Sequence, residues 1–165
     1  MVRERYLRQL DLLKEAVLSL GEIVQRVFRD SVIAVEHLDI KLAERTIASE
    51  TEINKLEEGI EVSICDLLAL QQPIASDLRL VVSSLKITAD LKRIEGLSIN
   101  IAKIPGKIEG GHIKPLVDTR KMAILQHTCS RTPSRLLRLR TSNSQERQRL
   151  GMMRSTSFFT QSGLN

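Results

Sequence analysis

Residues 7–27 of the chain read LRQLDLLKEAVLSLGEIVQRV, and this stretch decides the fold. Its apolar residues recur at steps of three and four positions, the spacing that places side chains on one face of an α-helix. We therefore predict one long helix over about residues 3–36. Its apolar stripe consists of Leu7, Leu10, Leu13, Val17, Leu20, Val24 and Val27.

A second helix is predicted from Ile40 to about Leu70. Asp39 precedes it and is a good N-cap, because its carboxylate can accept hydrogen bonds from the free amide groups of the first turn. The acids Glu57 and Glu61 fall largely on the side away from the apolar stripe. That stripe consists of Ile53, Leu56, Ile60, Ile64 and Leu67.

Pro73 then interrupts the pattern, since proline lacks an amide donor and suits the first turn of a helix. The segment Gln71-Gln72-Pro73 is accordingly predicted to be a short connection into a third helix, which ends before Pro105. The apolar stripe of this helix consists of Ile74, Leu78, Val81, Leu85, Leu91, Ile94 and Ile101.

Three helices of about 30 residues, each with one apolar stripe, bury those stripes by packing together. Because the connections are short, consecutive helices run antiparallel, and each spans about 45 Å. The predicted fold class is all-α, an elongated antiparallel three-helix bundle over residues 1–108. Residues 109–123 contain a linker at Gly110-Gly111 and the start of a fourth helix near Thr119 that does not continue.

The composition changes near Ile124. Residues 1–123 carry 18 Lys and Arg against 19 Asp and Glu, whereas residues 124–165 carry 7 against 1, so the net charge of +5 comes from the tail. This tail is rich in Arg, Ser and Thr and has too little apolar area to offset the chain entropy lost on folding. We predict that residues 124–165 are largely disordered.

Other features exclude several classes of protein. Four aromatic residues and no Trp disfavour a β-sandwich with an aromatic core and stacking platforms for single-stranded nucleic acid. Cys65 and Cys129 form no metal or redox motif, which indicates a reducing, cytoplasmic location. No run of about 18 apolar residues occurs, so we expect a chain that is neither secreted nor membrane-spanning.

Four stretches carry a family resemblance. Residues 68–80, LALQQPIASDLRL, and residues 87–103, ITADLKRIEGLSINIAK, resemble the corresponding parts of the PhoU family of phosphate-uptake regulators. Residues 39–44, DIKLAE, and residues 52–57, EINKLE, resemble the second helix of that family. The similarity covers about residues 2–123, in order and with the expected helix lengths.

This resemblance implies a non-enzymatic, cytoplasmic negative regulator that restrains phosphate uptake. It would act as an adaptor between a phosphate ABC transporter and a sensor histidine kinase, and would associate with the membrane peripherally through these partners. The family has two tandem three-helix repeats, so residues 114–123 would open a second repeat that the chain abandons. We expect self-association, as a homodimer or larger homo-oligomer, to cover the exposed side of the single repeat.

A change of reading frame near residues 123–125 would explain the lost periodicity, the absence of lysine and the surplus of Arg and Ser together. Under this hypothesis the chain is truncated, and two alternatives stay open: a nonfunctional remnant, or a single repeat that buries its exposed side by self-association. The coding DNA tests it: an intact second repeat in a shifted frame supports the hypothesis, and its absence from every frame contradicts it.

The resemblance also implies residues that contact partners at the second turn and on the third helix. Ordinary local roles remain open for several of them. Asp77 suits the first turn of a helix because of the helix dipole, and Gln-Gln-Pro suits a turn without any partner. The implied contact residues are Gln71, Gln72, Pro73, Asp77, Arg79 and Arg93.

PhoU-like proteins carry a Glu/Asp-x-x-x-Asp pattern on this helix, which can chelate a hard cation because residues four apart share a face. Lys92 and Gly96 stand at these positions. We therefore expect the Fe, Mn, Zn or Mg cation of the family to be lost, and we predict no cofactor. Asp90 is the remaining candidate ligand, but about 140° of helical rotation separates it from Glu95, and solvated helix acids are the favoured interpretation of both.

Two alternative functions remain. Glu57 and Glu61 have chelating spacing, which would suit a metal-binding helical bundle, although an exposed acidic face is the simpler interpretation. The tail would suit nucleic-acid binding, yet we favour an unstructured tail and predict no specific nucleic acid. The histidines are scattered, and no catalytic arrangement is predicted. The residues concerned are the basic cluster Arg131, Arg135, Arg138 and Arg140, and the histidines His37, His112 and His127.

Overall fold

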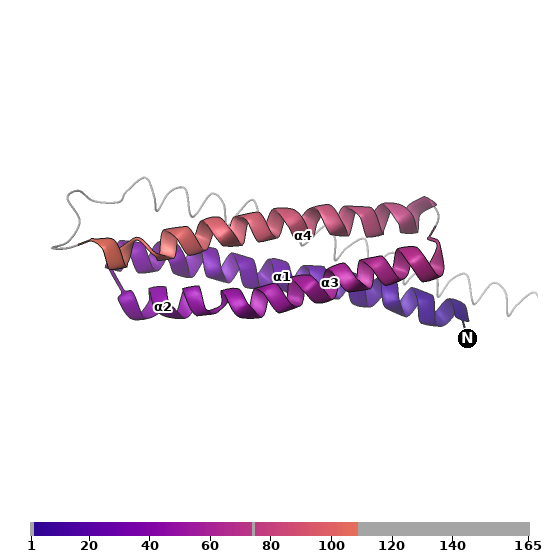
Figure 1. Ribbon diagram of the computed structural model, residues 1–165, viewed down its shortest axis with the longest axis horizontal. Helices are drawn as coiled ribbons and strands as arrows, with labels where there is room; N and C mark the ends of the chain where they lie inside the picture. The colour runs from indigo at the N-terminus through magenta and orange to yellow at the C-terminus, as the bar shows by residue number, and fades with distance from the viewer. Residues whose placement is uncertain (1, 74, 109–165) are drawn as a thin grey trace, which may run out of the picture. The chain divides into compact units, whose positions relative to one another are not determined.

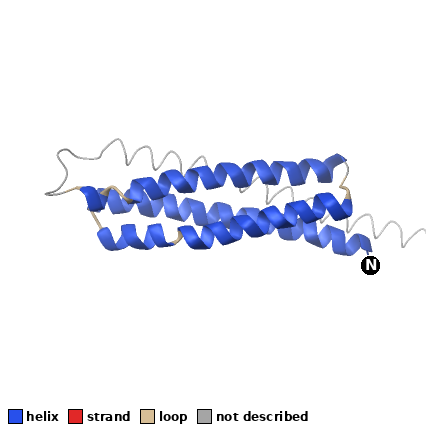
Figure 2. Ribbon diagram, viewed as in Figure 1, coloured by secondary structure: helices blue, strands red, loops and turns tan. Residues whose placement is uncertain are grey.

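The computed structural model describes residues 2–73 and 75–108 (Figure 1). These residues contain no β-strand (Figure 2). α2 and α3 follow one another along a single rod, so three rods pack side by side and alternate in direction. The predicted all-α, antiparallel three-helix bundle is confirmed. Its elements are α1 (Val2–His37), α2 (Ile40–Ala48), α3 (Glu50–Gln71), α4 (Ala75–Ala102) and the short 3₁₀ helix η1 (Pro105–Lys107).

Several predictions lie outside the described residues. They concern the linker at Gly110-Gly111, the fourth helix within residues 109–123, and the disorder and basic cluster of residues 124–165. Within the described ranges, none of the helices is both long enough and apolar enough to cross a membrane.

The connection between α1 and α2 is a Schellman motif followed by a cap. The amides of Leu38 and Asp39 donate to the carbonyls of Val35 and Ala34, at 3.4 and 2.9 Å, and Leu38 takes a left-handed φ of 52°. The side chain of Asp39 then accepts a hydrogen bond from the amide of Leu42 at 3.0 Å. The predicted N-cap is therefore confirmed.

The single helix predicted from residue 40 to about residue 70 is wrong in one respect, because it is interrupted at Ser49 and forms α2 and α3. The Ser49 hydroxyl donates to the Thr46 carbonyl at 2.6 Å, and the Thr46 hydroxyl donates to the Leu42 carbonyl at 2.8 Å. Such bonds from Ser and Thr to the preceding turn bend helices. Ser49 itself keeps right-handed angles, and its carbonyl accepts from the amide of Ile53, so α3 continues in the same direction as α2.

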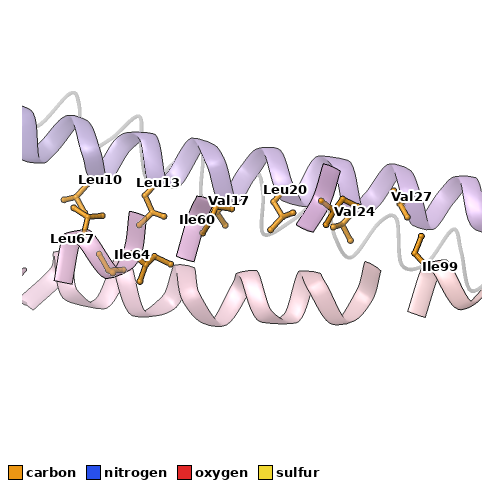
Figure 3. Packing of buried hydrophobic residues seen from close by; sticks show 12 residues of the cluster. Leu10, Leu13, Val17, Leu20, Val24, Val27, Ile60, Ile64, Leu67 and Ile99 are labelled. Atoms are coloured by element: carbon orange, nitrogen blue, oxygen red, sulfur yellow. The ribbon is translucent and has the colours of Figure 1, made fainter. Parts of the chain in front are cut away.

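The core lies along the axis of the bundle, between α1, α3 and α4 (Figure 3). The stripe predicted for α1 is buried from Leu10 to Val27. In Figure 3 the N-terminal part of this stripe, from Leu10 to Val17, lies opposite Leu67, Ile64 and Ile60 of α3, and Val27 lies beside Ile99 of α4. α3 contributes the buried residues Ile53, Ile60, Ile64 and Leu67, which also confirms its predicted stripe.

The stripe predicted for the third helix is partly wrong. Val81 and Ile99 are buried, but Leu78 and Leu85 are each 41% exposed. Both leucines lie about 40–60° around the helix axis from Val81, on the shoulder of the buried face. Besides these apolar residues, the buried face of α4 carries polar side chains. It contains Ser84, Thr88, Glu95 and Ser98.

Candidate partner-binding surface

The turn between α3 and α4 holds three of the residues implied in partner binding. α3 ends at Gln71, and Gln72 closes it with a left-handed φ of 45°. Gln72 is exposed, Gln71 is half-buried and Pro73 is buried. The predicted connection is thus present, and Gln72 presents the most surface to a partner.

Asp77 is half-buried in the first turn of α4, and both of its carboxylate oxygens accept hydrogen bonds within the chain. Its Oδ2 accepts a hydrogen bond from the phenol of Tyr6 at 3.0 Å, and its Oδ1 accepts one from Ser76 at 3.3 Å. Partial burial, followed by the hydrogen bond to Asp77 and the charge of that carboxylate, raises the pKa of Tyr6 to about 12. These contacts join the first turns of α1 and α4, which is a structural role for Asp77.

The outward surface of α4 combines basic and apolar side chains. Arg79, Lys86 and Arg93 are spaced by seven residues, so they lie along one face, and all three are exposed. Within the described part of the chain, none of them pairs with an acidic residue. We call this surface the α4 face; it consists of Leu78, Arg79, Val82, Leu85, Lys86 and Arg93.

The implied contact residues therefore divide into two groups. The first group lies at the turn and consists of Gln71, Gln72, Pro73 and Asp77. The second group is Arg79 and Arg93 on the α4 face, which are about 21 Å apart along the helix axis. A surface with apolar side chains between separated cations suits a partner that is acidic and partly apolar. The α4 face is therefore the better candidate for binding.

Lys92 forms a clasp between α3 and α4. Its ammonium donates a hydrogen bond to Oδ1 of Asn54 and lies 3.8 Å from Oε2 of Glu57, both on α3. It also lies 3.1 Å from Oε2 of Glu95, one turn farther along α4. Glu95 is only 1% exposed, so the expectation that it is a solvated helix acid is wrong.

The residues present do not fit the metal cation that the family resemblance implies. The Lys92 ammonium already contacts three oxygen-bearing side chains at this place, and Gly96 supplies no ligand. Asp90 is exposed and Glu95 is buried, so the two carboxyl groups face different surroundings. Among the described residues no group of three or more His, Cys, Asp or Glu side chains is arranged to hold a metal ion.

Three residues of this region are not among those predicted from the sequence. Tyr6 lies 71 positions from Asp77, and only the parallel direction of α1 and α4 in an up-down-up bundle could have indicated their contact. Asn54 contacts Lys92 from a different helix, and no local pattern marks it. Lys86 could have been found, because it lies midway between Arg79 and Arg93 at helical spacing.

Comparisons of the chain with a family model and with individual proteins point to the same family. The profile described as "PhoU domain" matches residues 17–104, which is more than half of the 165 residues. One relative, the phosphate-specific transport system accessory protein PhoU homolog of Rhizobium meliloti (strain 1021), is 30% identical over 138 residues, covering 77% of this chain and 58% of the relative.

Two further relatives carry similar names. The phosphate-specific transport system accessory protein PhoU of Serratia marcescens is 33% identical over 95 residues, covering 58% of this chain and 39% of that protein. The PhoU homolog of Streptococcus pneumoniae serotype 4 is 32% identical over 114 residues, covering 69% of this chain and 53% of that protein. The chain thus spans about half the length of the curated relatives it matches.

Proposed function

The chain belongs to the PhoU domain family, and on this premise we propose that it is an accessory protein of a phosphate-specific transport system. In this proposal it has no enzymatic activity. It restrains phosphate uptake as a helical adaptor that links the phosphate ABC transporter to a sensor histidine kinase of the phosphate response.

The observation that carries the proposal is the match of the family profile to residues 17–104. This range includes most of α1 and all of α2, α3 and α4, so it covers the helices that build the core and the α4 face. The three relatives described above are all named as accessory proteins of phosphate-specific transport.

The α4 face is the proposed contact surface for a component of the transporter. Its exposed leucine and valine side chains provide apolar area, and its three cations provide charge complementarity to an acidic patch on the partner. Gln72 at the adjoining turn extends the surface toward the end of the bundle.

Location and self-association complete the proposal. The chain would act in the cytoplasm and reach the membrane through its partners. A second copy would cover apolar side chains that α3 exposes, such as Val62 and Leu70, which are 56% and 74% exposed. Sedimentation over a range of protein concentrations tests this part: a dimer or larger assembly is expected, and a strictly monomeric, fully helical chain contradicts it.

A complementation experiment tests the regulatory role. The chain would be expressed in cells that lack their own PhoU protein, and a phosphate-response reporter and phosphate uptake would be measured in phosphate-rich medium. The proposal predicts that the chain lowers both readouts, and that charge reversal at Arg79 and Arg93 abolishes this effect at equal protein level. Unchanged readouts with well-expressed, helical protein would contradict the proposal.

A further inference from the structure

The clasp at Lys92 is built from oxygen atoms of two helices around one positive charge. The amide oxygen of Asn54 and the carboxylates of Glu57 and Glu95 approach the ammonium from α3 and α4. Carboxylate and amide oxygens are also the ligands that hard divalent cations prefer. The arrangement therefore has the chemistry of a cation site in which a side chain of the protein supplies the cation.

Glu95 makes a positive charge necessary at this place. Its side chain is 1% exposed, and its Oε1 has no hydrogen-bond partner among the described residues, while Oε2 contacts Lys92. A buried carboxylate without a compensating charge is strongly unfavourable. Lys92 is the cation within 4 Å that the described residues provide for Glu95.

We propose that the Lys92 ammonium is the resident cation of an oxygen-lined site between α3 and α4, and that a divalent metal ion binds there only when this ammonium is removed. In the native chain the ammonium both occupies the oxygens and repels a second cation. The α3–α4 contact is consequently independent of metal. This inference does not rest on the proposed function, because it concerns the stability of the bundle and not a partner.

Space beside the clasp is consistent with the proposal. A Cβ atom built at Gly96, four residues after Lys92 on α4, meets no atom within 4 Å. The Lys92 side chain is 30% exposed and that of Glu57 is 21% exposed, so shortening Lys92 would let ions from the solvent reach these oxygens. The oxygens would then provide charge but only a partial coordination shell, and water would supply the remaining ligands.

The test compares thermal unfolding of four full-length proteins, with and without millimolar MnCl₂, and measures Mn²⁺ binding by calorimetry. The proteins are the native chain, Lys92→Ala, the double variant Lys92→Ala/Glu95→Gln, and Lys86→Ala. The last removes an exposed lysine from the same helix and is the matched control.

The proposal predicts that Lys92→Ala lowers the unfolding midpoint by roughly 5–15 °C, and that Mn²⁺ restores most of this loss. The native chain and Lys86→Ala should neither bind Mn²⁺ nor change their midpoints on its addition. The double variant should be more stable than Lys92→Ala in the absence of metal and insensitive to Mn²⁺, because the buried charge is gone.

Three results would overturn the proposal. In the first, the native chain binds Mn²⁺ as well as Lys92→Ala does. In the second, Lys92→Ala is no less stable than Lys86→Ala, and in the third, Lys92→Ala is destabilised but Mn²⁺ does not restore its stability. If Lys92→Ala does not fold without metal, circular dichroism during addition of Mn²⁺ reports its folding. A double variant that also fails to fold would contradict the proposal, since it contains no uncompensated carboxylate at residue 95.

Discussion

The phenol of Tyr6 donates a hydrogen bond to Oδ2 of Asp77, with 3.0 Å between the oxygens and 71 residues of sequence between the two positions. The bond joins the first turns of α1 and α4, two rods that run parallel with the antiparallel α3 packed against both. The bond fixes the register of the two helices, that is, how far one is shifted along its axis relative to the other. Apolar packing alone specifies this register weakly, because the apolar stripes repeat every turn.

This bond makes the stability of the bundle sensitive to alkaline pH. The pKa of Tyr6 rises from 10.0 to about 12, chiefly through burial and also through the hydrogen bond and charge of Asp77. Because the folded-state pKa is the higher one, the contribution of Tyr6 is fully present below pH 10 and is lost as the pH rises through about 12. Denaturant unfolding from pH 8 upward should show this loss in the native chain, and Tyr6→Phe should lack it.

The chain contains a single tyrosine, so tyrosinate absorbance reports this one group. The titration midpoint should lie near 12 in the native chain and should be lower in Asp77→Asn, which lacks the negative charge but keeps the burial of Tyr6. A midpoint that is the same in both proteins would contradict the contribution assigned to Asp77. Parallel loss of stability in the native chain and Tyr6→Phe would contradict the assigned pH dependence.

The core around Leu20 should dominate the stability of the bundle. Leu20 is completely buried, whereas Leu12 on the same helix is 54% exposed. Leu20→Ala should lower the free energy of unfolding by about 2–5 kcal/mol, and Leu12→Ala by less than about 1 kcal/mol. Urea unfolding followed by circular dichroism measures both. Equal losses would show that α1 does not pack through the stripe that contains Leu20.

Gly96 offers a stabilising substitution. It lies inside α4, and a Cβ atom at this position meets no atom within 4 Å. Gly96→Ala should therefore raise the free energy of unfolding by roughly 0.5–1 kcal/mol, because alanine loses less backbone entropy in a helix. Gly59 in α3 has similar space and should respond alike. A decrease in urea stability for Gly96→Ala would indicate a close contact that this packing lacks.

Gln72 allows binding to be separated from folding. It is exposed and takes a left-handed φ of 45°, which glycine adopts without steric cost. Gln72→Gly should thus keep or raise the unfolding midpoint while removing the side chain from the turn. If Gln72 contacts a partner, this variant should regulate phosphate uptake less well despite its intact fold. A destabilised variant would instead show that the Gln72 side chain supports the turn.

Much of the fold could be predicted from the sequence because its information is local. The periodic stripes of α1 and α3 and the cap at Asp39 depend on neighbouring residues, and the structure confirms them. The interruption at Ser49 coincides with two hydroxyl groups that bond to the preceding turn, which apolar periodicity does not predict.

The errors on α4 have a common physical origin. Counting apolar residues treats Leu78 and Leu85 as core, although the buried centre of the helix is set by small polar side chains such as Ser84 and Thr88. Glu95 seemed solvated because its surroundings come from other helices, including the α3 residue Asn54 that shares Lys92 with it. Contacts with other helices determine the burial of these residues, and the local sequence pattern alone could not predict it.

The role of the α4 face in binding is tested most directly by measuring the affinity of the immobilised chain for the ATPase component of a phosphate transporter. The account predicts salt-sensitive binding that the charge reversals Arg79→Glu and Arg93→Glu weaken at least about tenfold, with helicity and unfolding midpoint unchanged. The matched control reverses Arg8 and Arg26, which are exposed on α1. No binding by the native chain, or equal binding by both charge-reversed proteins, would contradict the account.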